Sequence, residues 1–320
     1  MKNVILNFIF IFLFSFSVMA NNNDKLKDKF IVVLDAGHGG HDSGNRGNGY
    51  LEKEIALTIT LEIGKLLSKN KDIEVIYTRK DDRYVDLLKR AQIANDANAD
   101  LFISIHCDAF TSPKAYGAGT FVLGLHANER NFEVAKKENS VIFLEDDYEK
   151  NYDGFDPNNP ESIISLLLMQ EEYLEQSIIA ARSIQKSFVS VLGRKDRTVK
   201  QAGFIVLKYT YMPSVLVETG FLTNKKEGAY LNSKEGKNSM AKTISKAIID
   251  YKNQLNTFVS AEKFNPSING SISKDKVELT KSLSYKVQIS ASKNKIETKS
   301  YNFNSLNSII RIKSGETYKT

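Results

Sequence analysis

The sequence predicts an α/β fold built on an open, mostly parallel twisted sheet with helices on both faces. Continuous apolar runs at residues 30–35 and 101–105 are typical of buried parallel strands. Apolar residues recur with helical spacing over residues 52–67. Because strands and helices alternate along the chain, the sheet is expected to be covered on both sides.

The remaining elements follow the same alternation until one long interruption. Residues 126–165 contain an acidic run followed by Tyr-, Pro- and Asn-rich sequence, and predict an irregular insertion. Such an insertion in a compact domain is typical of a functional lid or a mobile loop. Further strands are expected at 73–78, 119–123, 203–207 and 214–217, and further helices at 86–98, 161–192 and 237–255.

The chain of 320 residues suits one large domain with an appendage. Residues 28–255 are predicted to form the main domain, and residues 256–281, rich in Ser, Asn and Lys, a linker. Residues 282–320 predict a short β-containing tail, with strands at 284–290 and 308–312.

Residues 1–20 are interpreted as a secretory signal peptide. Lys2 precedes an apolar run over residues 4–19, and Val18 and Ala20 supply the small residues of a cleavage site. The alternative is an uncleaved membrane anchor, but the run is short for a bilayer span. The prediction is a secreted, periplasmic or cell-envelope protein with no transmembrane anchor after cleavage.

The net charge of +6 is confined to the tail. Residues 256–320 hold 11 of the 44 Lys and Arg residues and 5 of the 38 Asp and Glu residues. A basic tail favours anionic polymers or membrane surfaces without identifying either. No basic and aromatic motif for reading nucleic acid is present, so a nucleic-acid partner is not expected.

Cys107, the only cysteine, cannot form an internal disulfide. It follows His106, which makes a nucleophile or metal ligand an alternative. On a strand, however, adjacent side chains point to opposite faces, and the prediction is a small buried residue.

Two histidines point to a metal site. His38 and His106 follow apolar strands, and the carboxyl ends of parallel strands share one edge of a sheet. Glu52, in the first turn of the next helix, lies on its apolar face, whereas Glu54 points elsewhere. Taken alone, Glu52 would be a helix cap. With two histidines and an open water position it forms a catalytic zinc site.

Glu218 is the candidate catalytic base. It ends the apolar strand at 214–217, where a carboxylate can take a proton from zinc-bound water and pass it to a leaving amine. The alternative is a structural acid beside the site. His41 is predicted to be a surface or substrate-side residue, and Arg90 to form a structural ion pair.

The chain resembles the zinc-dependent N-acetylmuramoyl-L-alanine amidases of bacterial cell-wall metabolism over about residues 30–252. The metal motifs are similar to LDAGHGG (34–40), LEKE (51–54) and SIHCDA (104–109), and the catalytic segment to MPSVLVETGFLTN (212–224). YTR (77–79), RAQIAN (90–95) and QAGF (201–204) match as well.

The resemblance implies zinc ligands at His38, Glu52 and His106 and a catalytic acid/base at Glu218. It implies hydrolysis of the amide between N-acetylmuramic acid and L-alanine in peptidoglycan, for wall remodelling or daughter-cell separation. The rival functions are a zinc carboxypeptidase or peptidase, and a non-catalytic wall-binding protein. Because all four catalytic positions are filled, the second rival is disfavoured.

Two features depart from the family pattern. Asp108 stands where the third motif usually has Asn, which changes a contact beside the metal. The insertion 126–165 resembles regulated members, in which a segment blocks the zinc until an activator protein displaces it. The acids Glu138, Glu145, Asp146 and Asp147 are available as blocking residues, and a solvated loop is the alternative.

The segment YKVQISA (285–291) resembles the opening of a SPOR domain, a module that binds glycan strands. The remaining chain is about half as long as such a domain, so only a partial SPOR-like segment is expected over 282–320.

Overall fold

The computed structural model describes residues 29–124, 129–159, 171–263, 283–289 and 297–303. The chain divides into two units, Met1–Lys263 and Phe264–Thr320. In the second unit, β9 (Leu283–Ile289) matches the predicted strand at 284–290 and pairs antiparallel with β10 (Glu297–Phe303), which was not predicted. The predicted signal peptide and the predicted strand at 308–312 lie outside the described residues, as does most of the predicted linker.

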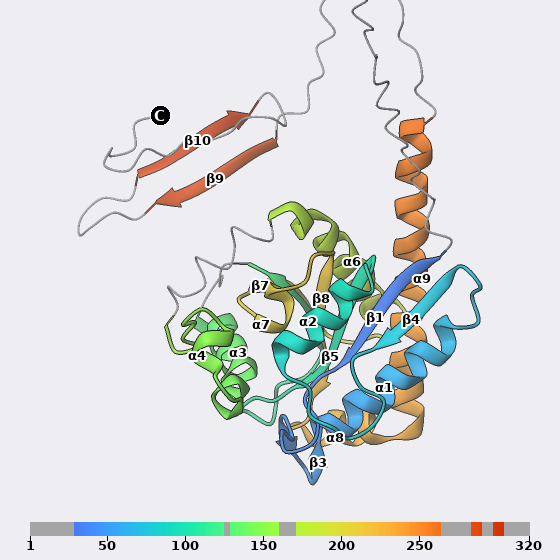
Figure 1. The fold of residues 1–320 in the computed structure, drawn as a ribbon, viewed down its shortest axis with the longest axis vertical. Coiled ribbons are helices and arrows are strands. Elements are labelled where there is room, and N and C mark those ends of the chain that lie inside the picture. Colours follow the sequence, from blue (N-terminus) through green and yellow to red (C-terminus); the bar gives the residue numbers. More distant parts are fainter. Residues whose placement is uncertain (1–28, 125–128, 160–170, 264–282, 290–296, 304–320) are drawn as a thin grey trace, which may run out of the picture. The chain divides into compact units, whose positions relative to one another are not determined.

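A six-stranded sheet forms the centre of the first unit (Figure 1). Its strand order is β4-β1-β5-β8-β6-β7, and only the β6–β8 pair is antiparallel. This arrangement confirms the predicted α/β class with a mostly parallel open sheet. The strands are β1 (Phe30–Ala36), β4 (Ile73–Tyr77), β5 (Leu101–Asp108), β6 (Ala118–Leu123), β7 (Asp196–Ala202) and β8 (Ser214–Phe221).

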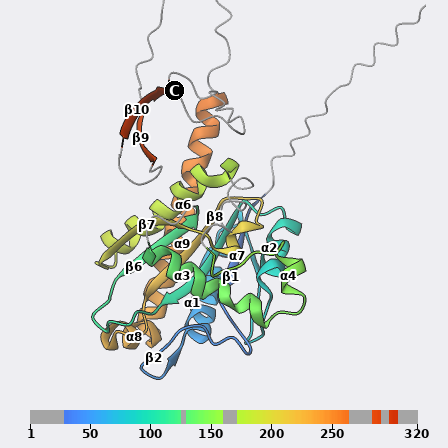
Figure 2. The same ribbon diagram turned by 90° about the vertical axis from the view of Figure 1, so that its left-hand side faces the viewer.

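Successive residues of each strand enter two different cores, one on each face of the sheet. Val32 and Leu34 of β1 pack with α1 (Glu52–Leu67), α6 (Glu171–Ser190) and α9 (Lys234–Lys263). Val33 packs on the other face, with α2 (Leu87–Asp96) and α7 (Ile205–Lys208). The two views show helices on both sides of the sheet (Figures 1 and 2). The smaller elements are β2 (Arg46–Gly47), β3 (Tyr50–Leu51) and α8 (Lys225–Asn232).

Most predicted elements form close to their expected bounds. The first helix occupies residues 52–67, as predicted, because its inward positions Ile55, Ile59 and Ile63 are apolar and fully buried. β5 runs past the predicted end at residue 105 to Asp108, so that His106 lies within the strand. α6 covers 171–190 of the predicted helix 161–192, residues 161–170 lie outside the described part, and α9 extends beyond residue 255 to Lys263.

The predicted strand at 203–207 is wrong. The strand there is β7 (Asp196–Ala202), and residues Ile205–Lys208 form the short helix α7. A short apolar run does not separate strand from buried helix by its periodicity. β7 lies at the end of the strand order and carries Asp196, Arg197 and Lys200, a polar composition that suits an edge strand.

The insertion is largely helical over residues 129–151, which corrects the prediction of an irregular segment there. It forms α3 (Glu129–Asn139), the 3-10 turn η1 (Ser140–Leu144) and α4 (Tyr148–Asn151). The buried side of α3 includes Asn131, Glu138 and Asn139 beside Phe132 and Ala135. Because three of these five residues are polar, hydrophobic periodicity gave little sign of a helix. Among the described residues, no helix is both long and apolar enough to cross a bilayer.

The core beneath α1 generates a stability prediction. Ile59 is fully buried between α1 and the sheet, whereas the Lys65 side chain on the same helix is 70% exposed. We expect Ile59→Ala to lower the free energy of unfolding by about 2–5 kcal/mol, because it leaves a cavity. Denaturant unfolding measures the change, with Lys65→Ala as the control expected to stay within about 0.5 kcal/mol. Equal effects of both substitutions would contradict the packing.

Candidate metal centre

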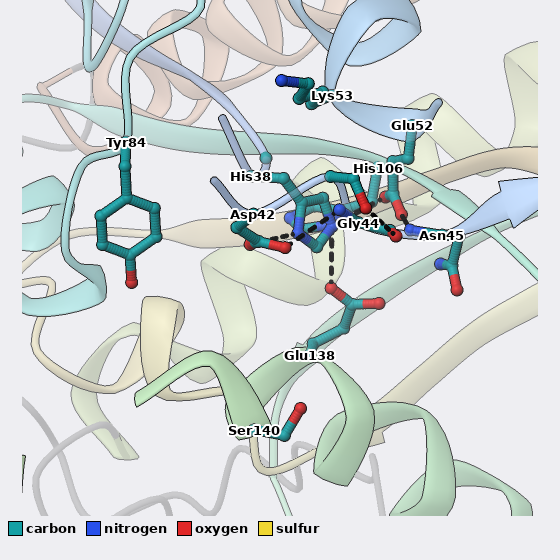
Figure 3. Close-up of polar contacts among 12 residues, drawn as sticks. His38, Asp42, Gly44, Asn45, Glu52, Lys53, Tyr84, His106, Glu138 and Ser140 are labelled. Carbon is teal, nitrogen blue, oxygen red and sulfur yellow. Dashed lines mark hydrogen bonds and ion pairs between the residues drawn. The ribbon is translucent and has the colours of Figure 1, made fainter. Parts of the chain in front are cut away.

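Four side chains converge at the carboxyl edge of the sheet (Figure 3). His38 follows β1, Glu52 begins α1, His106 lies in β5 and Glu138 lies in α3. One potential ligand atom from each residue lies within 4.8 Å of the others. The structure therefore brings together the three predicted ligands and adds a fourth residue from the insertion.

The spacing of these atoms fits a tetrahedral metal ion. His38 Nε2 lies 3.1 Å from Glu52 Oε1, 3.1 Å from Glu138 Oε2 and 3.2 Å from His106 Nδ1. His106 Nδ1 lies 3.1 Å from Glu52 Oε1 and 3.3 Å from Glu138 Oε2. A tetrahedron with ligands about 2.0 Å from zinc has edges of about 3.3 Å. The two carboxylates also balance the charge of a divalent cation, so the residues fit the metal.

The histidine-bearing loop after β1 is held from outside the cluster. His38 has a left-handed backbone with φ 60°, and its carbonyl accepts a hydrogen bond of 2.9 Å from Arg90 Nη2. Its Nδ1 lies 2.7 Å from Asp42 Oδ2, which leaves Nε2 directed at the other ligands. Gly37 lies against the His106 ring, where a Cβ would come within 2.5 Å of Cε1. A larger residue at Gly37 would therefore displace the second imidazole.

Glu52 is anchored by two backbone amides. Its Oε1 accepts a hydrogen bond of 2.7 Å from the Cys107 amide, and its Oε2 accepts one of 2.7 Å from the Asn45 amide. Glu54 is exposed on the same turn. Glu52 is buried and Glu54 is exposed, as their positions on the helix predicted.

The carboxylates of the cluster favour the protonated form of its histidines, and the histidines favour the ionised form of its carboxylates. Burial disfavours the imidazolium form of His106, but hydrogen bonds to Glu138 and Glu52 raise its pKa to about 9. Burial also opposes ionisation of Glu52, yet the His38 charge and the hydrogen bond with His106 hold its pKa well below the usual range. In the absence of a metal the site therefore holds protons, which metal binding must release.

Glu218 lies beside the cluster on β8. It pairs in register with His106 of β5, so both side chains lie on the face that carries α2 and α7. Among the described residues, neither of its buried carboxylate oxygens has a hydrogen-bond partner. Burial and the charges of Asp108, Glu52 and Glu138 raise its pKa well above the usual range. A buried, unpartnered acid at such a site is suited to proton transfer.

Of the four acids that the sequence offered as blocking residues, Glu138 is the one that lies at the cluster. Its carboxylate points from α3 toward both imidazoles (Figure 3). Glu145 instead accepts a hydrogen bond of 2.6 Å from Tyr84 Oη, and Asp146 and Asp147 are exposed. Sequence alone could not rank these acids, because the choice depends on how α3 lies over the sheet.

The insertion is fixed to the rest of the domain on both sides of Glu138. The Asn139 side chain donates to the Gly203 carbonyl at 2.7 Å and accepts from the Ile205 amide at 2.9 Å. Lys137 Nζ contacts Asn45 Oδ1 on the opposite side. Further along, Ile142, Tyr152 and Phe155 pack with Ile205 in a small core of their own.

Two hollows flank α3 at the metal centre. One, of about 340 Å³, is lined by His38 and Asp42, and the other, of about 710 Å³, by Asp108 and Phe110. They share Asn45, Lys137, Glu138 and Ser140. Lys137 and Glu138 of α3 thus line both hollows.

The four other residues that the sequence singled out, Cys107, Arg90, His41 and Asp108, lie outside the four-residue cluster. Cys107 is fully buried in the core on the face opposite His106, and burial raises the pKa of its thiol well above the usual range. Arg90 forms the expected ion pair, with Nη1 2.8 Å from Asp35 Oδ1. His41 is exposed, with its ring 4.3 Å from that of Tyr84. Burial raises the pKa of Asp108 to about 7.

A profile of the N-acetylmuramoyl-L-alanine amidases matches residues 32–250. The chain is 34% identical over 226 residues to N-acetylmuramoyl-L-alanine amidase AmiA of Escherichia coli, covering 70% of this chain and 76% of AmiA. Members of this family are zinc-dependent.

Solved structures agree. The N-acetylmuramoyl-L-alanine amidase from Clostridium difficile 630 superposes with a TM-score of 0.54 at 26% identity, covering 71% of this chain and 98% of that one. The CwlD amidase from Clostridioides difficile, solved in complex with the GerS lipoprotein, gives a TM-score of 0.52 at 26% identity, covering 70% and 99%.

The cluster predicts that metal binding depends on Glu52 and not on its neighbour. We expect zinc to raise the melting temperature of the metal-free chain, because a ligand of the native state stabilises it. Glu52→Gln should remove most of this rise, whereas Glu54→Gln should leave it intact. Calorimetry with and without zinc measures both, and a full zinc response in Glu52→Gln would contradict the ligand set.

Proposed function

This chain belongs to the N-acetylmuramoyl-L-alanine amidase family, and on that premise we propose how its metal centre carries out the reaction. As a member, the chain is a hydrolase that acts on peptidoglycan. The bond cleaved joins the lactyl carboxyl group of N-acetylmuramic acid to the amino group of L-alanine. Water adds to the amide carbonyl carbon, the C–N bond breaks, and a carboxylate and an amine result.

His38, Glu52 and His106 would hold a zinc ion in this proposal. When bound, zinc supplies Lewis acidity, which polarises a carbonyl and lowers the pKa of water to about 7. The protein's own part is to fix two imidazole nitrogens and one carboxylate oxygen within 3.2 Å of one another. Asp42 and the Asn45 and Cys107 amides hold these ligands from behind.

Glu218 would take the proton from the attacking water and deliver it to the departing amine of L-alanine. The single observation that carries this role is its burial without a hydrogen-bond partner among the described residues, next to His106 in register. A carboxylate that served only structure would be expected to have buried donors around it. The positive charge of a bound divalent cation would favour the ionised form that a base requires.

Glu138 would hold the enzyme in an inactive form. Its Oε2 lies 3.1 Å from His38 Nε2 and 3.3 Å from His106 Nδ1, so it would bind the proposed zinc together with them and leave no open position for water or substrate. Lys137 and Glu138 of α3 also line both hollows beside the cluster. Activity would then require α3 to move away from the cluster.

An activator protein is the proposed cause of that movement. Asn139, Lys137 and the small core around Ile142 hold the insertion in place, so its displacement needs a compensating interaction. The similar CwlD amidase has been solved with a lipoprotein bound, which supports partner binding in this family. The proposed location is the periplasm or cell envelope, supported by the signal-like residues 1–20 and the peptidoglycan substrate.

The first test replaces Glu138 by alanine. Removing the blocking carboxylate should raise amidase activity by about 5- to 150-fold, the span of a typical coupling between sites. Release of soluble fragments from purified peptidoglycan measures the rate. Glu133→Ala, at an exposed position of the same helix, is the control and should leave activity unchanged. Unchanged or lower activity in Glu138→Ala would refute autoinhibition by this residue.

The second test replaces Glu218 by glutamine, both in the natural chain and together with Glu138→Ala. The amide keeps the shape but cannot accept the proton, so the rate should fall by about 10²- to 10⁴-fold while zinc stays bound. Mass spectrometry of the wall digest should show stem peptides with free L-alanine amino termini in the active chain. A Glu218→Gln variant that retains its rate would exclude this residue as the base.

The same digest separates the rival functions. New ends within the stem peptide would indicate a carboxypeptidase or other peptidase. Wall affinity without zinc and without cleavage would indicate a binding protein. A digest with a chelator is the control, because activity that survives metal removal would contradict a metal-dependent reaction.

A further inference from the structure

The imidazole of His106 is held on the side that faces away from the metal centre. Its Nδ1 faces the other ligands, whereas its Nε2 lies 3.0 Å from Ser104 Oγ. Ser104 Oγ in turn donates a hydrogen bond of 2.6 Å to Asp35 Oδ2. A buried chain therefore runs from Asp35 through Ser104 to the ring.

The sheet itself sets up this chain. Asp35 of β1 and Ser104 of β5 are direct partners in the parallel register. Ser104 and His106 are two residues apart in β5 and so lie on the same face. Asp35 and Ser104 have no exposed surface, and His106 is 5% exposed. No adjustment of flexible loops is needed to bring the three groups together.

The series of hydrogen bonds from Asp35 through Ser104 to His106 fixes which group donates and which accepts in each bond. Asp35 is an ion-paired carboxylate that only accepts, so the Ser104 hydroxyl hydrogen is committed to it. The Ser104 oxygen is then left as an acceptor toward His106 Nε2. The ring must carry its proton on Nε2, which leaves the lone pair of Nδ1 directed at the metal centre.

The far oxygen of Asp35 is held independently of this chain. Arg90 Nη1 lies 2.8 Å from Asp35 Oδ1, and Thr78 Oγ1 donates to the same oxygen at 2.5 Å. Arg90 also donates to the Ala36 and His38 carbonyls. The carboxylate thus keeps its position and charge whether or not Ser104 is present.

We propose that Ser104 and Asp35 are positioning residues that lock His106 in its metal-binding tautomer and orientation. This inference rests on the proposed function, because the group that His106 is positioned to hold is the metal ion of the amidase reaction. Neither residue is one of the four cluster residues, and Ser104 contacts the cluster at His106 Nε2, on the side of the ring away from the other ligands. Hydrogen-bond partners behind metal-binding histidines typically change metal affinity by about 10- to 100-fold when removed.

The experiment measures zinc affinity of the full-length chain by competition with a chromophoric chelator, without reference to activity. Ser104→Ala should weaken zinc binding by about 10- to 100-fold. The absorption spectrum of the Co²⁺-loaded protein should also change, because the imidazole is reoriented. Melting of the metal-free protein checks that the variant is folded.

The matched control is Thr78→Val. It removes a hydroxyl that donates to the same carboxylate but does not contact His106, so zinc affinity should stay within about threefold, inside the usual context error of such measurements. Ser104→Thr retains the hydroxyl and should restore most of the affinity and the natural Co²⁺ spectrum. A purely structural role would weaken binding in Thr78→Val as much as in Ser104→Ala.

An unchanged zinc affinity and Co²⁺ spectrum in a folded Ser104→Ala protein would overturn the inference. It would leave the proposed function standing, since that depends on the wall digest and on Glu218. Conversely, a zinc-loaded Glu138→Ala chain that yields no stem peptides would refute the proposed function, while the affinity comparison of Ser104→Ala with Thr78→Val would still be decided.

Discussion

The parallel register of β1, β5 and β8 is the constraint on which the site depends. It sets Asp35 beside Ser104 and His106 beside Glu218, all on one face of the sheet. Because neighbouring strands are fixed by backbone hydrogen bonds, these side chains inherit their spacing from the sheet. His38, Glu52 and Glu138 reach the cluster from a loop or a helix, and each has its own hydrogen bonds or ion contacts there.

The sheet and α1, which carry the three proposed metal ligands, were predictable from sequence. The apolar patterns that mark each element also indicate which of its faces is buried. In α1 the apolar positions Ile55, Ile59 and Ile63 mark both the helix and its buried face, and this face also carries Glu52. Strand-end histidines could be brought together without coordinates, because the carboxyl ends of parallel strands lie at one edge. The three proposed ligands were chosen on these grounds.

The parts that sequence did not resolve depend on polar or ambiguous segments. β7 is a polar edge strand and α7 a short apolar turn of helix, so periodicity indicated the wrong residues for the strand. Glu138 could not be distinguished from Glu145, because both lie in an insertion without a clear apolar pattern. Ser104 lay within a recognised motif, yet its contact with His106 appears only once the β1–β5 register is known.

The polar inner side of α3 has a consequence for reversibility. Asn131, Glu138 and Asn139 supply much of the surface that this helix hides, and Phe132 and Ala135 supply the apolar part. In the proposed movement, α3 would expose little apolar surface. It would therefore have little tendency to associate non-specifically with other proteins or with another copy of the chain. The hydrogen bonds of Asn139 would then return α3 to the same position beside Gly203 and Ile205.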